Sequence, residues 1–360
     1  MSKVILLAPI PPPIGGIAAW TVRMMNATLP NDWKVEVVDE KIIGKREFFG
    51  DKTKHDIKSE IKRCLGIWSG LIKALRDKEA KVVHACIAAN TMPVMREYIS
   101  AFITKSCGKK FIIHFRCTVP NIVGGRLNVI ALKMLCNKAD CVMLLNKQSE
   151  EYINGITKTR TVVIPNFVDA QEVVESHEIQ GSVKRVLYVG GVIESKGCLD
   201  IIEVAKSFPD IEFKLIGNPE DVCVKAAESV SNVLLAGTMP HSQIIEEMKR
   251  ADVFMFLTYF PGEGFSNSLA EAMAAGLPCI VTDWAANKDM IEDKGGVIVP
   301  VHDVKAAIKA LSGMQNSQVR KKQSMANIEK VKNTYGNKTV QSMYVKCYES
   351  LENTYHDVMR

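Results

Sequence analysis

Short apolar runs alternate with helix-like segments along the first half of the chain. Residues Ile17, Trp20, Met24 and Leu29 recur at helical spacing after the first apolar run. The runs that predict strands are KVILLA, KVEVVD, KVVHA, KKFIIHF, ADCVMLLN and TRTVVIPN. Short apolar strands that alternate with helices are typical of parallel βαβ units, because both faces of such a sheet are covered.

The same pattern restarts near residue 183. The strand-like runs are VKRVLYVGG, IEFKLIGN, SNVLLAG, ADVFMFLT and PCIVTD, with a helical CLDIIEVAKSF after the first. A stretch with few apolar residues and no clear period, PNFVDAQEVVESHEIQGSVKR, separates the halves. We therefore predict an α/β protein with two doubly wound, Rossmann-like parallel-sheet domains, at residues 1–168 and 180–335.

A C-terminal segment, about residues 338–360, is helical in pattern and is expected to pack back on the first domain. Its apolar positions share one face and are Val340, Met343, Tyr344, Cys347 and Leu351. Open α/β sheets bind ligands at the carboxyl ends of their strands. Two such domains that face each other are expected to enclose a ligand cleft there.

Composition is that of a globular protein, with 47% hydrophobic and 24% charged residues. The ten cysteines include no C-x-x-C pair and no cluster at zinc-ligand spacing, which favours reduced thiols in a cytoplasmic protein. The N-terminal apolar run is short and is followed by prolines, so a first strand is favoured over a signal peptide. No run of eighteen apolar residues predicts a transmembrane helix.

The net charge of +6 is concentrated in the first half. The stretch from Lys41 to Arg63 mixes lysines and arginines with aromatic and aliphatic residues. A solvated helix face explains this pattern, and so does a basic surface that rests on anionic lipid at the inner face of a membrane. Nucleic acid is disfavoured because no recognised nucleic-acid motif is present.

Three loops that follow predicted strands carry candidate chemistry. In PIPPPIGGIAAW, Gly15 and Gly16 would let the backbone approach a phosphate at a helix N-terminus, although a plain tight turn explains them too. In LYVGGVIESKGCLDII, Gly190 and Gly191 precede Lys196 at a helix start. A lysine there is unfavourable for the helix dipole unless a bound diphosphate supplies negative charge, and a solvated lysine is the alternative.

The third loop is PGEGFSNSLAEAMAAGLPCIVTDW, which places Glu263 and Glu271 eight positions apart. On one helix they would lie roughly 80° apart, so we expect Glu263 in a loop and Glu271 on the following helix. Ser266 or Asn267 is the expected N-cap. The two carboxylates could then hold the hydroxyl groups of one extended ligand, around backbone amides that bind its phosphates or sugar oxygens.

These motifs carry a family resemblance over nearly the whole chain, which is strongest at residues 160–305. The segments GEGFSNSLAEAMAAGLPCIVTD, VLYVGGVIESKG, VVIPNFVD and PPPIGG resemble the retaining GT-B glycosyltransferases, specifically the large family-4 group. The two glutamates followed by EAMAAGLP are specific to this group, whereas the glycine pairs alone are not.

The resemblance implies a role for each matching residue. Glu263 would contact the donor sugar near the reacting carbon, Glu271 would bind the ribose hydroxyls, and Lys196 would bind the diphosphate. The other donor-binding residues it implies are Gly15, Gly16, Gly190, Asn218, Thr238, Met239, Gly264, Phe265, Ser266, Asn267 and Ser268.

The chain departs from the family pattern at two places. Gly191 stands where an arginine is usual after the strand glycine, so diphosphate neutralisation would depend more on Lys196 and on backbone amides. In the strand end HFRC, either His114 or Arg116 could hold the position that the family gives to a histidine near the donor sugar. A core histidine is the alternative for His114, and His84 is a weaker candidate for the site.

The resemblance implies a metal-independent enzyme without a cofactor, and no Asp-x-Asp motif is present. We expect transfer of a sugar, with retention, from a UDP- or GDP-linked donor to a hydroxyl acceptor. A polyprenyl-linked saccharide in bacterial surface-polysaccharide assembly is the expected acceptor. The alternatives are a nucleotide-sugar epimerase and a non-catalytic nucleotide-sugar-binding subunit, whereas the absent dinucleotide fingerprint disfavours a dehydrogenase.

Overall fold

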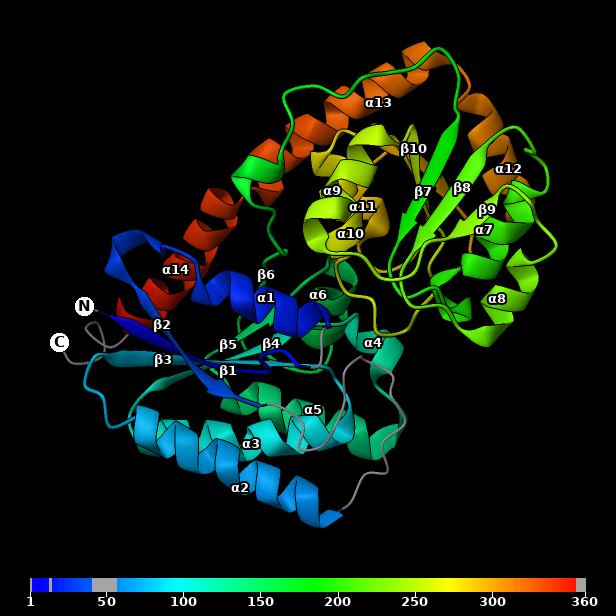
Figure 1. Ribbon diagram of the computed structural model, residues 1–360. Coiled ribbons are helices and arrows are strands. Elements are labelled where there is room, and N and C mark those ends of the chain that lie inside the picture. Colours follow the sequence, from blue (N-terminus) through cyan, green and yellow to red (C-terminus); the bar gives the residue numbers. More distant parts are fainter. Residues whose placement is uncertain (1, 13–14, 41–56, 354–360) are drawn as a thin grey trace. The chain divides into compact units, whose positions relative to one another are not determined.

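The computed structural model describes residues 2–12, 15–40 and 57–353. The chain forms two compact units (Figure 1). Unit 1 comprises residues 1–166 and 340–360, and unit 2 comprises residues 167–339. The second segment of unit 1 contains most of the last helix, α14 (Asn337–Asn353).

Unit 1 is built on a six-stranded sheet in the order β2-β1-β3-β4-β5-β6, in which every described pair is parallel. Its strands are β1 (Lys3–Ala8), β2 (Lys34–Asp39), β3 (Ala80–Ile87), β4 (Lys110–Phe115), β5 (Cys141–Leu144) and β6 (Thr161–Val163). The central strands are buried almost throughout, which explains their nearly continuous apolar sequences.

Two layers of helices cover this sheet. Helices α2 (Ile57–Ala74), α3 (Thr91–Ser106) and α5 (Gly125–Lys138) lie on one face, and α1 (Gly16–Met25) and α14 lie on the other (Figure 1). Shorter helices, α4 (Val119–Ile122) and α6 (Lys147–Asn154), and a 3₁₀ turn, η1 (Pro30–Asp32), complete the unit. The expected apolar face of the last helix is mostly buried, at Val340, Tyr344, Cys347 and Leu351.

Unit 2 contains the second six-stranded sheet, in the order β12-β11-β10-β7-β8-β9, again with parallel pairs. Its strands are β7 (Arg185–Val189), β8 (Glu212–Ile216), β9 (Val233–Leu235), β10 (Val253–Phe256), β11 (Cys279–Thr282) and β12 (Gly296–Val299). The longer helices are α7 (Cys198–Ala205), α8 (Asp221–Ala227), α9 (His241–Arg250), α10 (Asn267–Ala274), α11 (Asn287–Ile291), α12 (Val304–Gly313) and α13 (Ser317–Lys330). Short helical turns are η2 (Ala170–Glu172), η3 (Glu194–Lys196) and η4 (Val331–Tyr335).

This architecture confirms the predicted α/β class with two doubly wound parallel sheets. The strand order also explains where ligand-binding loops can meet within a unit. In unit 2 the chain leaves β7 toward β8 on one side and later returns to β10 on the other side, so the loops after β7 and β10 diverge at a topological switch point. In unit 1 the corresponding point lies between β1 and β3.

Two further expectations concern cysteines and membrane helices. All ten cysteines are free thiols, and most are buried. Among the described residues, no helix combines the length and apolar character that spanning a bilayer requires.

Candidate functional site

Close backbone contacts hold the loops of unit 2 at the carboxyl ends of its strands. Gly190 and Gly217, which follow β7 and β8, lie so close that a Cβ on Gly217 would be 1.7 Å from the Gly190 carbonyl oxygen. Gly197, before α7, has a φ of 75°, and a Cβ there would lie 2.0 Å from the carbonyl oxygen of Leu257 after β10. Only glycine avoids both the contact and the strain, so these positions fix the switch-point loops.

Lys196 and Glu263 meet at this switch point. Their side chains form an ion pair between the loop after β7 and the loop after β10. The Lys196 ammonium also lies 4.8 Å from the ring centroid of Phe260 and 5.7 Å from that of Phe256. The lysine is 20% exposed and the glutamate 9% exposed, so the pair is largely withdrawn from water. Two residues that were singled out separately in the sequence are therefore in contact.

Helix α10 begins directly after the Glu263 loop, as the motif predicts. Ser266 is its N-cap, and its hydroxyl accepts a hydrogen bond of 3.2 Å from the Leu269 amide and lies 3.2 Å from the Ser268 hydroxyl. Phe265 is buried, with its ring 5.2 Å from that of Tyr335. Glu263, Gly264 and Ser266 are also buried, whereas Asn267 and Ser268 are partly exposed.

Glu271 lies on the first turns of α10, as predicted, and contacts a residue that the sequence did not indicate. Its Oε1 atom is 3.4 Å from Nε2 of His241, the first residue of α9. The other ring nitrogen of His241 lies 3.8 Å from a carboxylate oxygen of Glu172. The His241 side chain is 48% exposed, whereas the Glu271 carboxylate beside it is buried.

The remaining residues that were predicted to bind the donor in unit 2 lie in loops after strands. Asn218 follows β8 and is exposed, and its carbonyl accepts a 3.0 Å hydrogen bond from the Val192 amide. Thr238 and Met239 lie in the loop between β9 and α9, and Pro240 separates them from His241. Thr238 is exposed and Met239 is partly buried.

In unit 1, Gly15 and Gly16 form the start of α1 after β1. Gly15 has extended backbone angles and offers no side-chain cap. A Cβ on Gly16 would meet no atom of the chain within 4 Å. Neither the turn nor the packing of the chain thus requires glycine at position 16, and the space beside this helix start is open.

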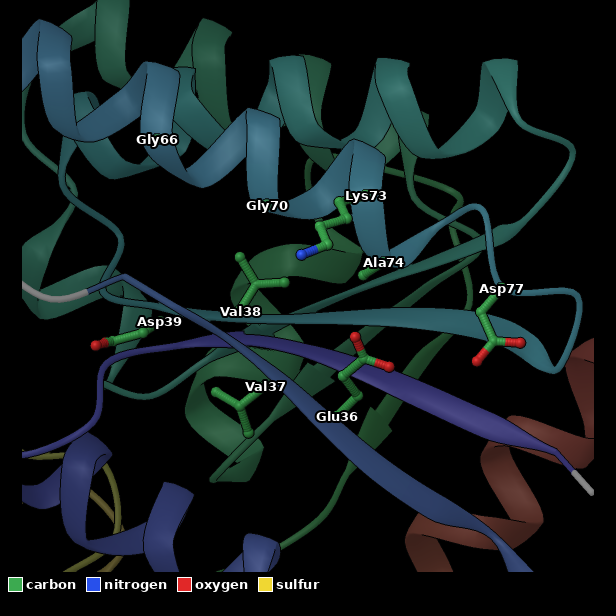
Figure 2. Close-up of a pocket in the computed structure, with 9 residues that line it drawn as sticks. All are labelled: Glu36, Val37, Val38, Asp39, Gly66, Gly70, Lys73, Ala74 and Asp77. Atoms are coloured by element: carbon green, nitrogen blue, oxygen red, sulfur yellow. The ribbon is translucent and has the colours of Figure 1, made fainter.

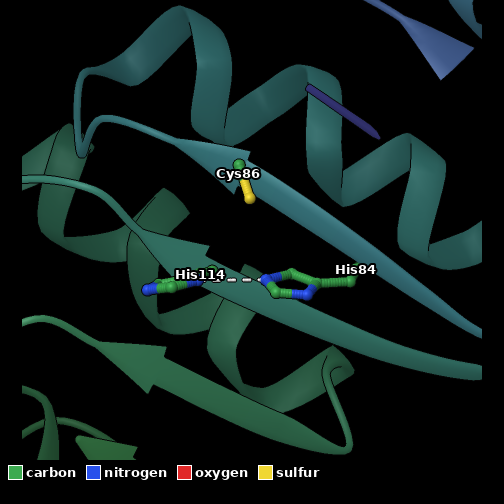
Figure 3. A group of neighbouring side chains, drawn as sticks. All are labelled: His84, Cys86 and His114. Atoms are coloured by element: carbon green, nitrogen blue, oxygen red, sulfur yellow. Dashed lines mark hydrogen bonds between the residues drawn. The ribbon is translucent and has the colours of Figure 1, made fainter. Parts of the chain in front are cut away.

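His114 and Arg116, the two alternatives at the end of β4, belong to one buried network. Arg116 donates a 2.5 Å hydrogen bond to Asn166, lies 3.3 Å from His114 Nε2, and its guanidinium is 4.3 Å from the Trp20 ring centroid. His114 Nδ1 lies 3.0 Å from His84 Nε2, and the planes of the two rings are inclined by 24° (Figure 3). His84 Nδ1 in turn lies 2.8 Å from the hydroxyl of Tyr348 on α14.

Both histidines of this network are held neutral. Burial, followed by the charge of Arg116, lowers the pKa of His84 to about 3. Burial, Arg116 and His84 together lower the pKa of His114 well below its usual value. His114 is fully buried, and Arg116 is 7% exposed. Of the two alternatives, Arg116 therefore has the more accessible side chain.

Two groups among the described residues place potential metal ligands close together. They are His84, Cys86 and His114 in unit 1, which Figure 3 shows, and Glu172, His241 and Glu271 in unit 2. In each group the potential ligand atoms lie within 4.8 Å of one another. The Arg116 guanidinium beside His114 opposes a cation at the first group. The second group is partly exposed and carries two carboxylates.

An open pocket of about 450 Å³ lies elsewhere in unit 1, along the edge strand β2 (Figure 2). Glu36, Val38 and Lys73 line it, together with Gly66 and Gly70 of α2. The two glycines remove side chains from consecutive turns of one helix face, which leaves the gap. No residue predicted to bind the donor lines this pocket.

Part of unit 2 matches a known protein family. Residues 169–332, which contain β7 to β12 and the Lys196–Glu263 pair, match the family Glycosyl transferases group 1. A phosphatidyl-myo-inositol mannosyltransferase of Mycolicibacterium smegmatis is 25% identical over 202 residues, which cover 53% of this chain and 52% of that protein. The corresponding protein of Mycobacterium leprae is 27% identical, covering 53% and 54%. The chain thus matches about half the length of these curated relatives.

Solved structures resemble the chain over nearly its whole length. A sucrose-phosphate synthase from Thermosynechococcus elongatus has a TM-score of 0.78 at 15% identity, with 98% of this chain and 100% of that chain covered. The lipopolysaccharide outer core galactosyltransferase WaaB has a TM-score of 0.71 at 17% identity, covering 97% and 99%. Anabaena Alr3699/HepE, in complex with UDP and glucose, has a TM-score of 0.75 at 13% identity, covering 97% and 100%. The chain therefore has the GT-B fold of these solved structures, and its residues 169–332 match the glycosyl transferases group 1 family.

Proposed function

We propose that the protein is a retaining, metal-independent glycosyltransferase of family 4. It transfers a hexosyl or N-acetylhexosaminyl group from a nucleoside diphosphate sugar to a hydroxyl acceptor. The observation that carries this proposal is the meeting of Lys196, Glu263 and the start of α10 at the switch point of a domain that matches the glycosyl transferases group 1 family.

Unit 2 supplies the groups that such a donor requires. Lys196 is the cation for the diphosphate, and the loop after β7 brings its backbone amides to the same place. When the diphosphate departs it gains negative charge, and a fixed ammonium beside it stabilises that charge better than mobile water does. In the absence of donor, Glu263 neutralises Lys196, so donor binding replaces one anionic partner of the lysine by another.

Glu271 is the proposed ligand of the ribose hydroxyls. A carboxylate has enough lone pairs to accept hydrogen bonds from two vicinal hydroxyls. Its position on a helix fixes it relative to the backbone, and the exposed ring of His241 lies beside it. Glu263 then contacts the transferred sugar, and Arg116 and His114 are the candidate groups of unit 1 for the same reaction.

The acceptor is proposed to be a polyprenyl-linked saccharide of bacterial surface-polysaccharide assembly, such as an O-antigen or capsule precursor. Relatives by sequence or fold include enzymes named for transfer to phosphatidylinositol and to lipopolysaccharide. A cytoplasmic protein that contacts the inner face of an anionic membrane would reach such an acceptor. The segment from Lys41 to Arg63 was predicted to form that contact, but residues 41–56 lie outside the described structure.

Thermal-shift measurements with UDP-, GDP- and ADP-sugars test the donor site. A ligand that binds only the folded state raises the unfolding midpoint. Glu271→Gln keeps the shape of the side chain and removes its charge, and it should weaken donor binding by about 2 kcal/mol because the ribose hydroxyls lose charged acceptors. Glu178→Gln, an exposed position elsewhere in unit 2, is the matched control.

The proposal requires that one class of donor raises the unfolding midpoint of the parent protein and of the control. The same donor should raise the unfolding midpoint of Glu271→Gln much less. If no nucleotide sugar shifts the midpoint, the donor assignment is wrong. If a donor binds but is neither hydrolysed nor transferred to any acceptor tested, the alternative of a non-catalytic nucleotide-sugar-binding subunit is supported instead.

A further inference from the structure

Apolar side chains are exposed in one region of unit 1 far more than elsewhere. Of the sixteen large apolar side chains that are exposed among the described residues, eleven lie on α2, α3 and α5. These eleven are Ile57, Ile61, Leu65, Ile72, Met92, Met95, Ile99, Phe102, Leu127, Ile130 and Met134. The other five lie on α1, α8, β9 and α13, with at most two on any one element.

On each of the three helices the exposed apolar residues form a stripe. On α3, Met92, Met95, Ile99 and Phe102 follow one another at intervals of three and four residues. Such spacing places side chains on one face of a helix. Because α3 already buries Val94, Ala101 and other residues against the sheet, the exposed stripe is a second apolar face that the unit itself does not use.

The three stripes belong to a common surface. Helices α2, α3 and α5 cover the same face of the sheet, with α3 in contact with both of its neighbours (Figure 1). Lys138 of α5 lies 5.3 Å from the ring centroid of Phe102 on α3, which joins the last two stripes. We name the exposed side of α2, α3 and α5 the outer helical face. It is larger and more apolar than the scattered apolar side chains of an ordinary soluble surface.

The outer helical face is also positively charged. The three helices contain nine lysine and arginine residues, of which Arg96 is buried, but two acidic residues, Glu60 and Glu97. Glu97 is fully buried and bonded to Arg96, and Glu60 is paired with Arg63 at 2.8 Å. The exposed charges beside the apolar stripes are therefore basic, with Lys62, Lys73 and Lys133 among them.

We propose that the outer helical face is a docking surface for an anionic lipid bilayer. The apolar stripes enter the boundary between headgroups and acyl chains, and the lysines contact the headgroup phosphates. Charge decides between this occupant and a second copy of the chain, because two copies of one strongly basic face would repel each other. Apolar side chains flanked by basic ones are the pattern of helices that lie in a membrane interface.

This surface overlaps the basic stretch that the sequence emphasised only at residues 57–63 of α2, whereas the rest of α2 and all of α3 and α5 lie outside residues 41–63. The proposal does not depend on glycosyl transfer, because lipid binding can be measured without any sugar. It adds to the proposed function a defined side of unit 1 that would lie against the membrane.

Co-sedimentation with vesicles tests the electrostatic part. Vesicles of phosphatidylglycerol and phosphatidylcholine are compared with phosphatidylcholine alone, at low and high salt. The variant Lys62→Gln/Lys73→Gln/Lys133→Gln should bind the anionic vesicles about a hundredfold more weakly than the parent, at about fivefold per lysine. High salt should also weaken the binding of the parent protein to anionic vesicles, because salt screens exposed charges. The matched control removes three exposed lysines of unit 2, at positions 305, 309 and 321, and should bind like the parent.

The apolar part has its own variants. Leu65→Ser/Phe102→Ser/Ile130→Ser should weaken vesicle binding by about a thousandfold, at about tenfold for each inserted side chain. The control Val222→Ser/Val319→Ser/Met325→Ser changes exposed apolar residues of unit 2 and should have no effect. All six positions are exposed, and equal unfolding midpoints would show that each variant is folded.

Three results would overturn the proposal. The first is equal binding of the parent to neutral and anionic vesicles, or to neither. The second is an equal loss of binding in the unit 2 controls. The third is a dimeric parent protein that the serine variant converts to monomers in light scattering, because the outer helical face would then be covered by a second copy.

Discussion

Removal of the charge of Lys196 should lower both the stability of the fold and the turnover, for two different reasons. Lys196→Met keeps the apolar stem beside Phe256 and Phe260 but leaves the carboxylate of Glu263 without this partner. An exposed ion pair contributes at most about 1 kcal/mol, whereas breaking a buried one costs about 3–5 kcal/mol. With the two side chains 20% and 9% exposed, the pair lies nearer the buried limit, and we expect a loss of about 2–3 kcal/mol.

The double variant Lys196→Met/Glu263→Gln separates the two effects. It replaces the unpaired charge by a neutral amide, so about half of the lost stability should return. Turnover should fall about a hundredfold or more in the single and in the double variant, because the diphosphate loses its cation in both. Scanning calorimetry gives the stability of each variant, and release of the nucleoside diphosphate gives turnover. Hydrogen exchange of residues 257–266 reports whether the Glu263 loop opens.

Two outcomes would refute this reasoning. An unchanged unfolding temperature of Lys196→Met would mean that the ion pair contributes nothing in solution. Recovery of turnover together with stability in the double variant would mean that Lys196 acts by holding the Glu263 loop and not by binding diphosphate.

Three other changes have defined outcomes. The lowered pKa of His84 means that the unfolded chain binds more protons between pH 6.5 and about 3, so the free energy of unfolding should fall as pH falls through this window, and His84→Gln should reduce that slope in denaturant titrations. Gly217→Ala should lower the unfolding temperature strongly, because its Cβ would lie 1.7 Å from the Gly190 carbonyl oxygen, whereas Gly16→Ala has open space and should unfold like the parent. Gly191→Arg should fold, because this residue has no positive φ and its nearest Cβ contact is at 3.8 Å, and calorimetry should show tighter donor binding if a cation is missing there.

Local pattern was sufficient for most of the fold. Strands such as Lys3–Ala8 and Lys110–Phe115 are buried on both faces, so their sequences are recognisable as mostly apolar runs, each after a first lysine. Strand β12 was not predicted. It is four residues long and begins at Gly296, where a Cβ would lie 1.9 Å from the Cys279 carbonyl oxygen. Gly296 is thus needed because two strands approach closely there. In a single sequence, a glycine with this role looks the same as a glycine that marks a loop.

The sequence predicted the parts of the candidate site whose residues are near one another in the chain. It did not predict contacts between residues that are far apart in the chain. Ser266 as an N-cap and Glu271 within α10 follow from local spacing. The Lys196–Glu263 pair joins residues 67 positions apart, and the contact between His84 and Tyr348 joins residues 264 apart. The contact of His241 with Glu271 likewise depends on how α9 and α10 pack. Such pairings are set by tertiary structure and leave no periodic signal.

The outer helical face shows a different limit of sequence reasoning. Helix α3 carries apolar residues on two sides, and periodicity alone does not tell which side meets the sheet. Burial resolves this, because Val94 is enclosed whereas Met92 is 66% exposed. The basic character of the first half was visible in the sequence, but its location beside apolar stripes on adjacent helices was not.

Identification of the product made from a nucleotide sugar tests the central claim most directly. The donor that raises the unfolding midpoint most would be incubated with polyprenyl-linked saccharide acceptors. Mass spectrometry would then identify the product, and nuclear magnetic resonance would give the configuration of its new glycosidic bond. The account predicts one added sugar with the same anomeric configuration as in the donor, and about thirtyfold slower product formation with Glu271→Gln at a donor concentration well below saturation. An inverted product would contradict retention, and no transfer from any bound donor would contradict the proposed activity itself.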